Sequence, residues 1–313
     1  MKIGLYTDSL PDLGFEAVLD WAAEQGLDAV EIGTGNFSSA PHCNLTELAA
    51  NSDARARFKA AFAERRLTLS ALNCNGNLLD PHPERGKNAQ AVFFKTVQVA
   101  SQLGLDTVVT MSGCPGDLSV SAYPNWVTHN WQPEFYELYE RQWTEAVEPF
   151  WKQAGQFAAD HGVRIAIEMH PGQVVYNTRT LLRLREIAGQ AVGANFDPSH
   201  LFYQGMDPLA VIRALGKGVI FHAHAKDTRL DPFRMAVNGG FDPYPMTELD
   251  QRTWVYRALG YGHDRKWWCD FVSELRLVGY DGVVSIEHED LLMNPREGII
   301  KSIQFLRDVT WGT

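Results

Sequence analysis

The feature that most constrains this chain is an eightfold alternation of short apolar, β-branched runs with longer stretches of helical periodicity. The runs predict strands at 2–7, 28–33, 68–74, 106–112, 163–169, 192–197, 219–225 and 282–288. The gaps between them predict helices, for example at 14–25, 87–103, 137–160 and 178–188. Strands that alternate with helices without an intervening linker favour a closed parallel sheet with the helices outside. We therefore expect a single (β/α)8 TIM barrel domain over residues 1–313.

An open, doubly wound sheet is the competing fold. It usually has fewer repeats and a glycine-rich loop that binds phosphate groups, but the sequence contains no GxGxxG, GxxxxGKS or GxxxxGKT. The helix ends also indicate regular βα units, because Gly26, Gly104, Gly162 and Gly279 each follow a predicted helix directly before a strand. Glycine in the left-handed conformation ends a helix and turns the chain back toward the sheet.

Two connections are much longer than the others. Residues 113–136 follow the fourth strand and residues 226–264 follow the seventh, so both leave the end of a barrel strand at which active sites lie. Both contain Trp, Tyr and Phe, which argues against disorder. We expect these loops to close the mouth of the barrel and to select the substrate, with Trp131 as a candidate for stacking on it. The competing interpretation is that the aromatic residues pack on one another or across a dimer interface.

The composition excludes several classes of protein. With 28 Lys and Arg against 38 Asp and Glu, the formal charge of −10 disfavours a nucleic acid as partner. The four cysteines form no CxxC pair, which argues against a disulfide scaffold or a zinc knuckle and fits a reducing compartment. No run of 18 apolar residues predicts a membrane span, and the first apolar run is too short for a signal peptide. We expect a soluble, cytoplasmic enzyme.

Ionisable residues on the inward face of four consecutive predicted strands indicate a chemical site. Alternate residues of a barrel strand face the interior, and this parity turns four residues inward near the ends of their strands: Glu168, Asp197, His224 and Glu287. Buried charges are costly unless they are paired or bind a cation. Three carboxylates and one imidazole predict a site for one divalent metal ion, with Mn²⁺ preferred and Mg²⁺, Co²⁺ or Zn²⁺ as alternatives. Glu31 on the second strand is expected to be structural.

Three other polar residues near the strand ends each have two interpretations. His170, two residues after Glu168 on the same side, is either an additional general base or a residue that caps or orients its neighbours. Lys226 either binds substrate oxygens or forms an ion pair with Asp227 at the rim. Asn75, after the third strand, either contacts substrate hydroxyl groups or only stabilises a turn.

Four segments resemble the xylose isomerase-like barrels, a family that includes sugar-phosphate isomerases and epimerases, ketose 3-epimerases and inosose-processing enzymes. The segments are AIEMHP at 166–171, NFDPSH at 195–200, HAHAKD at 222–227 and SIEHED at 285–290. The resemblance covers nearly the whole chain and implies the same four metal ligands.

The resemblance also assigns roles to individual residues. It implies that His200 contacts substrate hydroxyl groups and that Arg229 does likewise. In the ketose epimerases the two glutamates at the metal exchange protons with the substrate, which would make Glu168 and Glu287 an acid/base pair. The chain departs from those enzymes between the fifth and sixth strands and in its long loops.

Together, these features predict a metal-dependent isomerase or epimerase that acts on a keto-sugar or related polyol by enolisation. The first alternative starts with the same proton abstraction but ends in β-elimination, as in an inosose dehydratase, a 3-keto-glycoside lyase or the large subunit of a C-glycoside deglycosidase. The expected partner is a small sugar or glycoside, and a homo-oligomer or a small partner subunit is compatible with either reaction. An abasic-site endonuclease on the same barrel is disfavoured, because it needs a trinuclear zinc cluster and a basic face. The intact set of four ligands disfavours a catalytically dead barrel.

Overall fold

The computed structural model describes residues 1–118 and 121–310. These residues form two compact units. The first contains Met1–Glu31, Ala61–Ser70 and the chain from Phe196 onward, and the second contains Ile32–Ala60 and Ala71–Asn195.

The first unit is built on parallel strands around β1 (Lys2–Tyr6). This strand pairs with β2 (Ala29–Gly33) on one side and with β10 (Val283–Ile286) on the other, and β10 pairs with β7 (Ile220–Ala225). Their registers place Tyr6 opposite Glu31 and Ser285 opposite His224. The helices of this unit, apart from one described below, are η1 (Thr7–Ser9), α1 (Phe15–Glu24), α8 (Ser199–Phe202), α9 (Pro208–Leu215), α11 (Arg265–Leu277) and α12 (Pro295–Val309).

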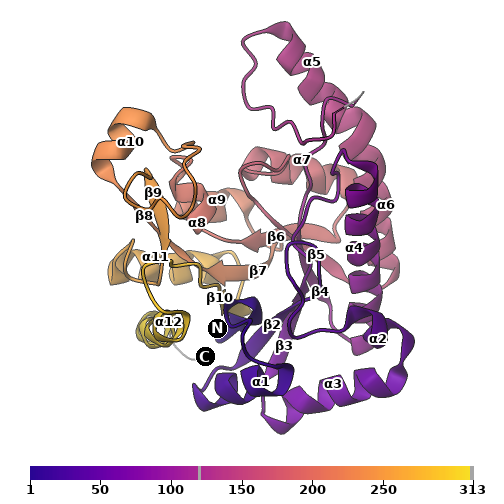
Figure 1. Cartoon of the computed structure of the whole chain (residues 1–313), viewed down its shortest axis with the longest axis vertical. Helices are drawn as coiled ribbons and strands as arrows, with labels where there is room; N and C mark the ends of the chain where they lie inside the picture. Colours follow the sequence, from indigo (N-terminus) through magenta and orange to yellow (C-terminus); the bar gives the residue numbers. More distant parts are fainter. Residues whose placement is uncertain (119–120, 311–313) are drawn as a thin grey trace. The chain divides into compact units, whose positions relative to one another are not determined.

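The second unit is built on the parallel neighbours β3 (Thr68–Asn73), β4 (Thr107–Met111), β5 (Arg164–Glu168) and β6 (Val192–Phe196). In the register of the last pair, Glu168 lies opposite Asn195. The helices that accompany these strands are α2 (Leu45–Ala50), α3 (Ser52–Glu64), α4 (Pro83–Leu103), α6 (Glu148–Asp160) and α7 (Thr178–Ala188). Figure 1 shows these elements along the chain and labels most of them, with the exception of β1 and η1.

The strand order is that of a closed parallel barrel, β1-β10-β7-β6-β5-β4-β3-β2. Each of the eight predicted strands contains one of these observed strands, so the predicted fold class is confirmed. The strands are apolar and β-branched over most of their length, and residues such as Leu5, Ile165 and Val284 are fully buried. Burial on both faces explains why these strands appear in the sequence as continuous apolar runs.

Helix ends follow the predicted local signals. α4 ends at Leu103 as predicted and is capped by Gly104, whose φ of 74° is left-handed, but it begins at Pro83 and not at the predicted residue 87. The other three glycines expected to end helices also have positive φ, namely Gly26, Gly162 and Gly279. α7 begins at the predicted residue, where the side chain of Asn177 accepts a hydrogen bond from the backbone N–H of Thr180 at 3.0 Å.

The connection predicted as a loop over 226–264 contains regular structure, so that prediction needs correction. β8 (Asp227–Leu230) and β9 (Trp254–Arg257) pair in an antiparallel manner, and α10 (Pro232–Asn238) lies between them. Asp227 connects the two ends of this segment, since its carboxylate accepts hydrogen bonds from the backbone N–H groups of Gly260, Gly262 and His263 at 2.9–3.1 Å.

The connection predicted over 113–136 is shorter than expected. α5 (Pro133–Arg141) and the π-helical segment η2 (Gln142–Val147) run directly into α6, whereas the sequence predicted that this helix starts at 137. Gln142 is buried, and its amide donates to the carbonyl groups of Pro115, Gly116 and Asn125, which ties the loop to the helix. Residues 119 and 120 of the predicted loop lie outside the described residues.

Candidate functional site

Three of the four predicted metal ligands come together in the first unit. Asp197 directly follows β6, His224 lies in β7 and Glu287 directly follows β10. Each of the three offers a ligand atom within 4.8 Å of the others, and the His224 Nδ1 atom is 3.2 Å from the Glu287 carboxylate. His224 is fully buried and Asp197 is only 2% exposed. The strand ends therefore place two carboxylates and an imidazole around one buried point.

Lys226 provides a buried cation beside these carboxylates. Its Nζ atom lies 2.6 Å from Glu287, 2.9 Å from Glu289 and 3.2 Å from Asp197. Burial alone would lower the pKa of Lys226, but the charges of Asp197, Glu287 and Glu289 hold this pKa well above its ordinary value. The three carboxylates therefore favour the charged form of Lys226. The ion pair expected with Asp227 is wrong, because Asp227 pairs with His263 Nδ1 at 2.8 Å and with backbone N–H groups instead.

His200 contacts the same carboxylate oxygen of Asp197 as Lys226 does, Oδ2. Its Nε2 atom is 3.1 Å from the Asp197 carboxylate, and its Nδ1 atom is 2.9 Å from the Tyr256 hydroxyl. The rings of Tyr256 and His200 also pack edge to face, with 5.7 Å between their centroids. His200 is only 1% exposed. These contacts fix the orientation of the imidazole and, through it, one oxygen of Asp197.

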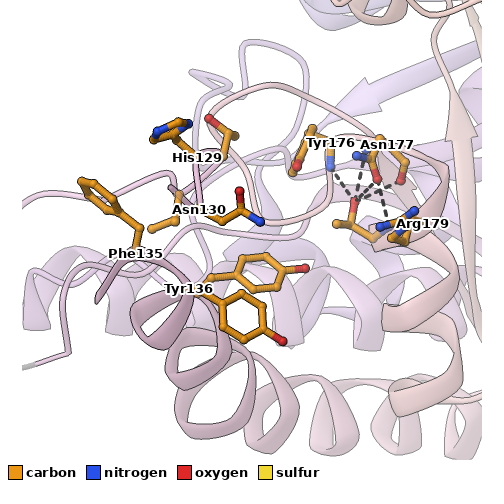
Figure 2. A pocket seen from close by; sticks show the side chains of 11 residues that line it. His129, Asn130, Phe135, Tyr136, Tyr176, Asn177 and Arg179 are labelled. Carbon is orange, nitrogen blue, oxygen red and sulfur yellow. Dashed lines mark hydrogen bonds between the residues drawn. The ribbon is translucent and has the colours of Figure 1, made fainter. Parts of the chain in front are cut away.

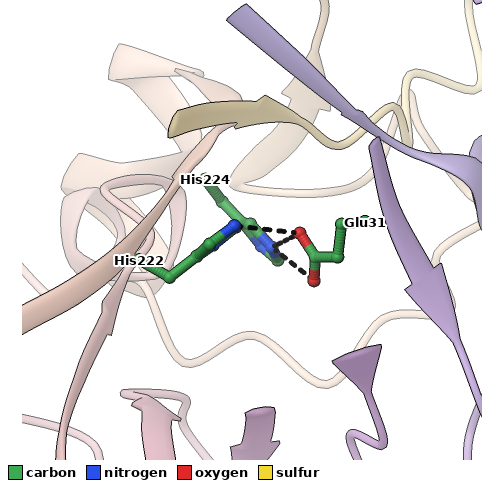
Figure 3. A group of neighbouring side chains, drawn as sticks. All are labelled: Glu31, His222 and His224. Carbon is green, nitrogen blue, oxygen red and sulfur yellow. Dashed lines mark hydrogen bonds and ion pairs between the residues drawn. The ribbon is translucent and has the colours of Figure 1, made fainter. Parts of the chain in front are cut away.

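His224 also has a partner on its second ring nitrogen. Its Nε2 atom lies 3.0 and 3.2 Å from the two carboxylate oxygens of Glu31, and His222 Nε2 is 3.7 Å from the same carboxylate (Figure 3). The ring of Tyr6 stacks on the ring of His224, with 6.1 Å between the ring centroids. All three residues of the Glu31–His222–His224 group are buried.

Glu168, the fourth predicted ligand, belongs to the second unit. It is the last residue of β5 and is 1% exposed. Its carboxylate accepts hydrogen bonds from the side-chain amides of Asn195 at 2.8 Å and of Asn75 at 3.4 Å. The Asn75 Oδ1 atom is buried and has no hydrogen-bond partner among the described residues. These amides hold the Glu168 carboxylate in one orientation.

The remaining predicted site residues differ in their exposure. His170 is half-buried, with Nδ1 2.5 Å from the carbonyl oxygen of Pro171. Arg229 points out of the β8–β9 hairpin and is exposed. Trp131 is 79% exposed. Trp254, in contrast, is buried in a cluster with Tyr203 and Tyr256, so for this residue the packing interpretation of the aromatic loops is correct.

A pocket of about 330 Å³ lies in the second unit (Figure 2). The loop after β4, helix α5 and the start of α7 form its walls. Its lining residues are Val127, Thr128, His129, Asn130, Phe135, Tyr136, Tyr139, Tyr176, Asn177, Arg179 and Thr180. Trp131 does not line it. The mixture of aromatic rings with amide and guanidinium groups suits a planar or sugar-like group.

Three residues around the ligands were not predicted as part of a site. Asn195 precedes Asp197 by two positions and shares its strand face, so the parity of β6 contained this signal. Glu31 was expected to be structural. It lies in β2 opposite Tyr6 and is the last residue of β2 that belongs to the first unit. Tyr256 is one of the aromatic residues of the long connections that were expected either to stack on a substrate or to pack, but the hairpin that contains it was not predicted.

The chemistry of the donors in the first unit fits a divalent cation. Asp197, Glu287 and Glu289 surround the single ammonium group of Lys226, which leaves carboxylate charge to be balanced. Carboxylate oxygens with one imidazole nitrogen suit Mn²⁺, Mg²⁺, Co²⁺ or Zn²⁺.

The sequence identifies the class of protein to which this fold and site belong. Residues 19–309 match the model of the xylose isomerase-like TIM barrel family, and the chain belongs to this family. It is 43% identical over 310 residues to the uncharacterized protein YfiH of Bacillus subtilis strain 168, covering 98% of both chains. It is also 25% identical over 180 residues to the inosose dehydratase of Bacillus thuringiensis strain Al Hakam, covering 54% of this chain and 55% of that enzyme.

Solved structures show the same fold. The IolI protein with a bound zinc atom has a TM-score of 0.67 at 19% identity, with 99% of this chain and 98% of that chain covered. A D-tagatose 3-epimerase-like protein has a TM-score of 0.66 at 18% identity, with 99% and 98% covered. None of the helices in residues 1–118 and 121–310 combines the length and apolar character needed to cross a bilayer.

Proposed function

We propose that this protein is a divalent-metal-dependent isomerase or epimerase of a keto-sugar or related polyol, which acts by enolisation, the removal of a proton next to a carbonyl group. The observation that carries the proposal is the convergence of the buried residues Asp197 and His224 with the half-buried Glu287 in the first unit. The name of one structural neighbour supports it, since that neighbour is a D-tagatose 3-epimerase-like protein.

Glu168 is the proposed fourth ligand. Like the other three ligands it lies at the end of a parallel strand, and in a parallel barrel these ends meet at one mouth, where active sites lie. The proposal accordingly treats residues 1–313 as one barrel domain. Mn²⁺ is the preferred ion, Mg²⁺ and Co²⁺ are alternatives, and Zn²⁺ is supported by the zinc-bound IolI structure. A divalent ion bound there would polarise a carbonyl oxygen and acidify the adjacent carbon.

The two glutamates are the proposed acid/base pair. Glu287 accepts a hydrogen bond from Lys226 and Glu168 is held by two amides, so both carboxylates are oriented to accept or return a proton. Because they follow different strands, they can serve two faces of a substrate. His170 is the alternative base. Its Nδ1 atom lies against a backbone carbonyl, which leaves Nε2 as the atom that would exchange a proton.

The residues proposed to bind substrate supply complementary polar groups. The Lys226 ammonium can contact a substrate oxygen while it balances Asp197 and Glu287. Asn75 Oδ1, which has no partner among the described residues, can accept a hydrogen bond from a hydroxyl group. His200, Arg229 and Trp131 remain proposed contacts, of which the last two are exposed.

A metal-dependent lyase is the second candidate. It would begin with the same proton abstraction but expel a leaving group, as in an inosose dehydratase, a 3-keto-glycoside lyase or a C-glycoside deglycosidase. The partial match to inosose dehydratase favours it.

The test is a panel of keto-sugars, inososes and 3-keto-glycosides incubated with Mn²⁺-loaded protein in D2O and followed by NMR. Deuterium at one carbon of an otherwise intact sugar supports the isomerase or epimerase. Loss of water or of an aglycone supports the lyase. The Asp197→Ala variant is the control, which should lose both the metal and the exchange. Full exchange by metal-free protein in a chelator, or no exchange with any substrate, would contradict the proposal.

A further inference from the structure

Glu31 and His224 form the most buried carboxylate–imidazole pair in the first unit's site. Both side chains have 0% exposure, and both oxygens of Glu31 lie within 3.2 Å of His224 Nε2. Figure 3 shows the carboxylate facing the ring edge, with His222 approaching the same carboxylate. Glu31 is thus directed at a proposed metal ligand and away from the bulk solvent.

The two nitrogens of His224 face different carboxylates. Nε2 faces Glu31, and Nδ1 lies 3.2 Å from Glu287. A neutral imidazole has one N–H and one lone pair, and only the lone pair can bind a metal ion. Glu31 presents two oxygens to Nε2, whereas Glu287 already accepts a hydrogen bond from Lys226 at 2.6 Å. This asymmetry favours the proton on Nε2 and the lone pair on Nδ1.

We infer that Glu31 is a positioning residue that holds the Nε2 proton of His224 and so presents the Nδ1 lone pair to the metal site. This inference rests on the proposed function, because His224 is one of its metal ligands. Tyr6 stacks on the imidazole at an interplanar angle of 17° and restricts rotation of the ring. Glu31 therefore selects the tautomer, while Tyr6 and the strand fix the direction in which Nδ1 points.

The same geometry argues against a second metal ion between Glu31, His222 and His224. Their ligand atoms also lie within 4.8 Å of one another, but an ion there would need the lone pair of His224 Nε2. That nitrogen cannot donate a proton to Glu31 and bind a metal at the same time. Binding ions at both nitrogens would require loss of both ring protons, so one ion per chain is expected.

The first measurement needs no variant. The ¹⁵N resonances of His224 are recorded in metal-free protein, at a pH where the ring is neutral, and again with Zn²⁺, which is diamagnetic. We expect the proton on Nε2 in both states, with the larger change of resonance at Nδ1 on addition of Zn²⁺. A proton on Nδ1 in the metal-free, neutral ring would overturn the role of Glu31, whether or not the protein binds metal.

The second measurement compares metal affinities by calorimetry with Mn²⁺. In Glu31→Gln the amide can donate to Nε2, which allows the tautomer with its proton on Nδ1, so we expect about 10–100-fold weaker binding. Glu289→Gln is the control, because it makes the same change of carboxylate to amide at a partner of Lys226. Glu289→Gln should weaken Mn²⁺ binding less than Glu31→Gln does. Both variants should unfold cooperatively on heating, which shows that they are folded.

The outcomes separate the two proposals. If the wild-type protein binds no divalent metal, the proposed function fails, while the ¹⁵N data still test Glu31. If the wild type binds one ion and Glu31→Gln binds it equally well, or if both variants lose the same affinity, the role of Glu31 is wrong. A second equivalent of metal that disappears in Glu31→Gln would show that the group is a metal site, and would also overturn the inference.

Discussion

The ammonium of Lys226 lies 2.6 Å from the carboxylate of Glu287, which in turn is 3.2 Å from Nδ1 of His224. Glu287 is therefore shared between a fixed cation and the imidazole proposed to bind a metal ion. Lys226 contacts the carboxylates of both Asp197 and Glu287, so it would share their negative charge with a divalent ion that these residues hold.

Replacing Lys226 by Met tests this balance. Asp197, Glu287 and Glu289 would lose their shared cation, and loss of one partner of a buried ion pair costs about 3–5 kcal/mol. We expect a lower melting temperature for metal-free Lys226→Met and a larger stabilisation by Mn²⁺ than in the wild type. Lys226→Arg, which keeps the charge, is the control. Equal melting temperatures of metal-free wild type and Lys226→Met would show that the carboxylates do not depend on this cation.

Two tryptophans of the long connections should behave differently on truncation. Trp254 is 8% exposed, stacks on Tyr203 at 3.9 Å and donates to the carbonyl oxygen of Gly240 at 2.9 Å. We expect Trp254→Ala to lower the free energy of unfolding in urea by about 3–5 kcal/mol. Trp131 is 79% exposed, so Trp131→Ala should change the free energy of unfolding by less than about 0.5 kcal/mol.

Kinetics then separate stability from substrate contact at Trp131. If its ring stacks on the substrate, as the sequence suggested, Trp131→Ala will raise KM while its unfolding curve stays unchanged. An unchanged KM across the substrate panel would exclude that role.

The pair between Arg213 and Glu274 predicts a pH dependence of stability. Hydrogen bonding by the Arg213 side chain lowers the pKa of Glu274 below its ordinary value of 4.5. Because the pKa is lower in the folded state, the stabilisation is fully present above pH 4.5 and is lost as the pH falls below it. The difference in free energy of unfolding between the wild type and Glu274→Gln should therefore shrink between pH 5 and pH 3. A difference that stays constant over this range would contradict the assignment.

The cysteines should fall into two classes of reactivity. Burial raises the pKa of Cys74 and of Cys114 to about 12, whereas Cys43 and Cys269 are half-buried. Thiolates react and thiols do not, so iodoacetamide at pH 8 should spare Cys74 and Cys114 in the folded protein. Peptide mapping by mass spectrometry checks this, and denatured protein should be alkylated at all four positions. Alkylation of Cys74 as fast as Cys269 would contradict the expected protection.

The positions of the strands and the faces of their residues were predictable from the amino acids alone. Periodicity located all eight barrel strands, because a strand buried on both faces must be an apolar run. Parity then singled out the inward residues, since successive side chains of a strand point to opposite sides. In this way Asp197, His224 and Glu287 were grouped before their proximity was observed.

The partners of those residues depended on the folded chain. Lys226 pairs with carboxylates 29, 61 and 63 positions away and leaves its neighbour Asp227 to the loop at 260–263. Glu31 contacts a histidine 193 positions away, through the register of strands that no local pattern encodes. The hairpin that brings Tyr256 to His200 was likewise missed. Local sequence sets the conformation of the backbone and the side to which a residue points, whereas hydrogen-bond partners follow from strand order and register, which only packing of the whole chain establishes.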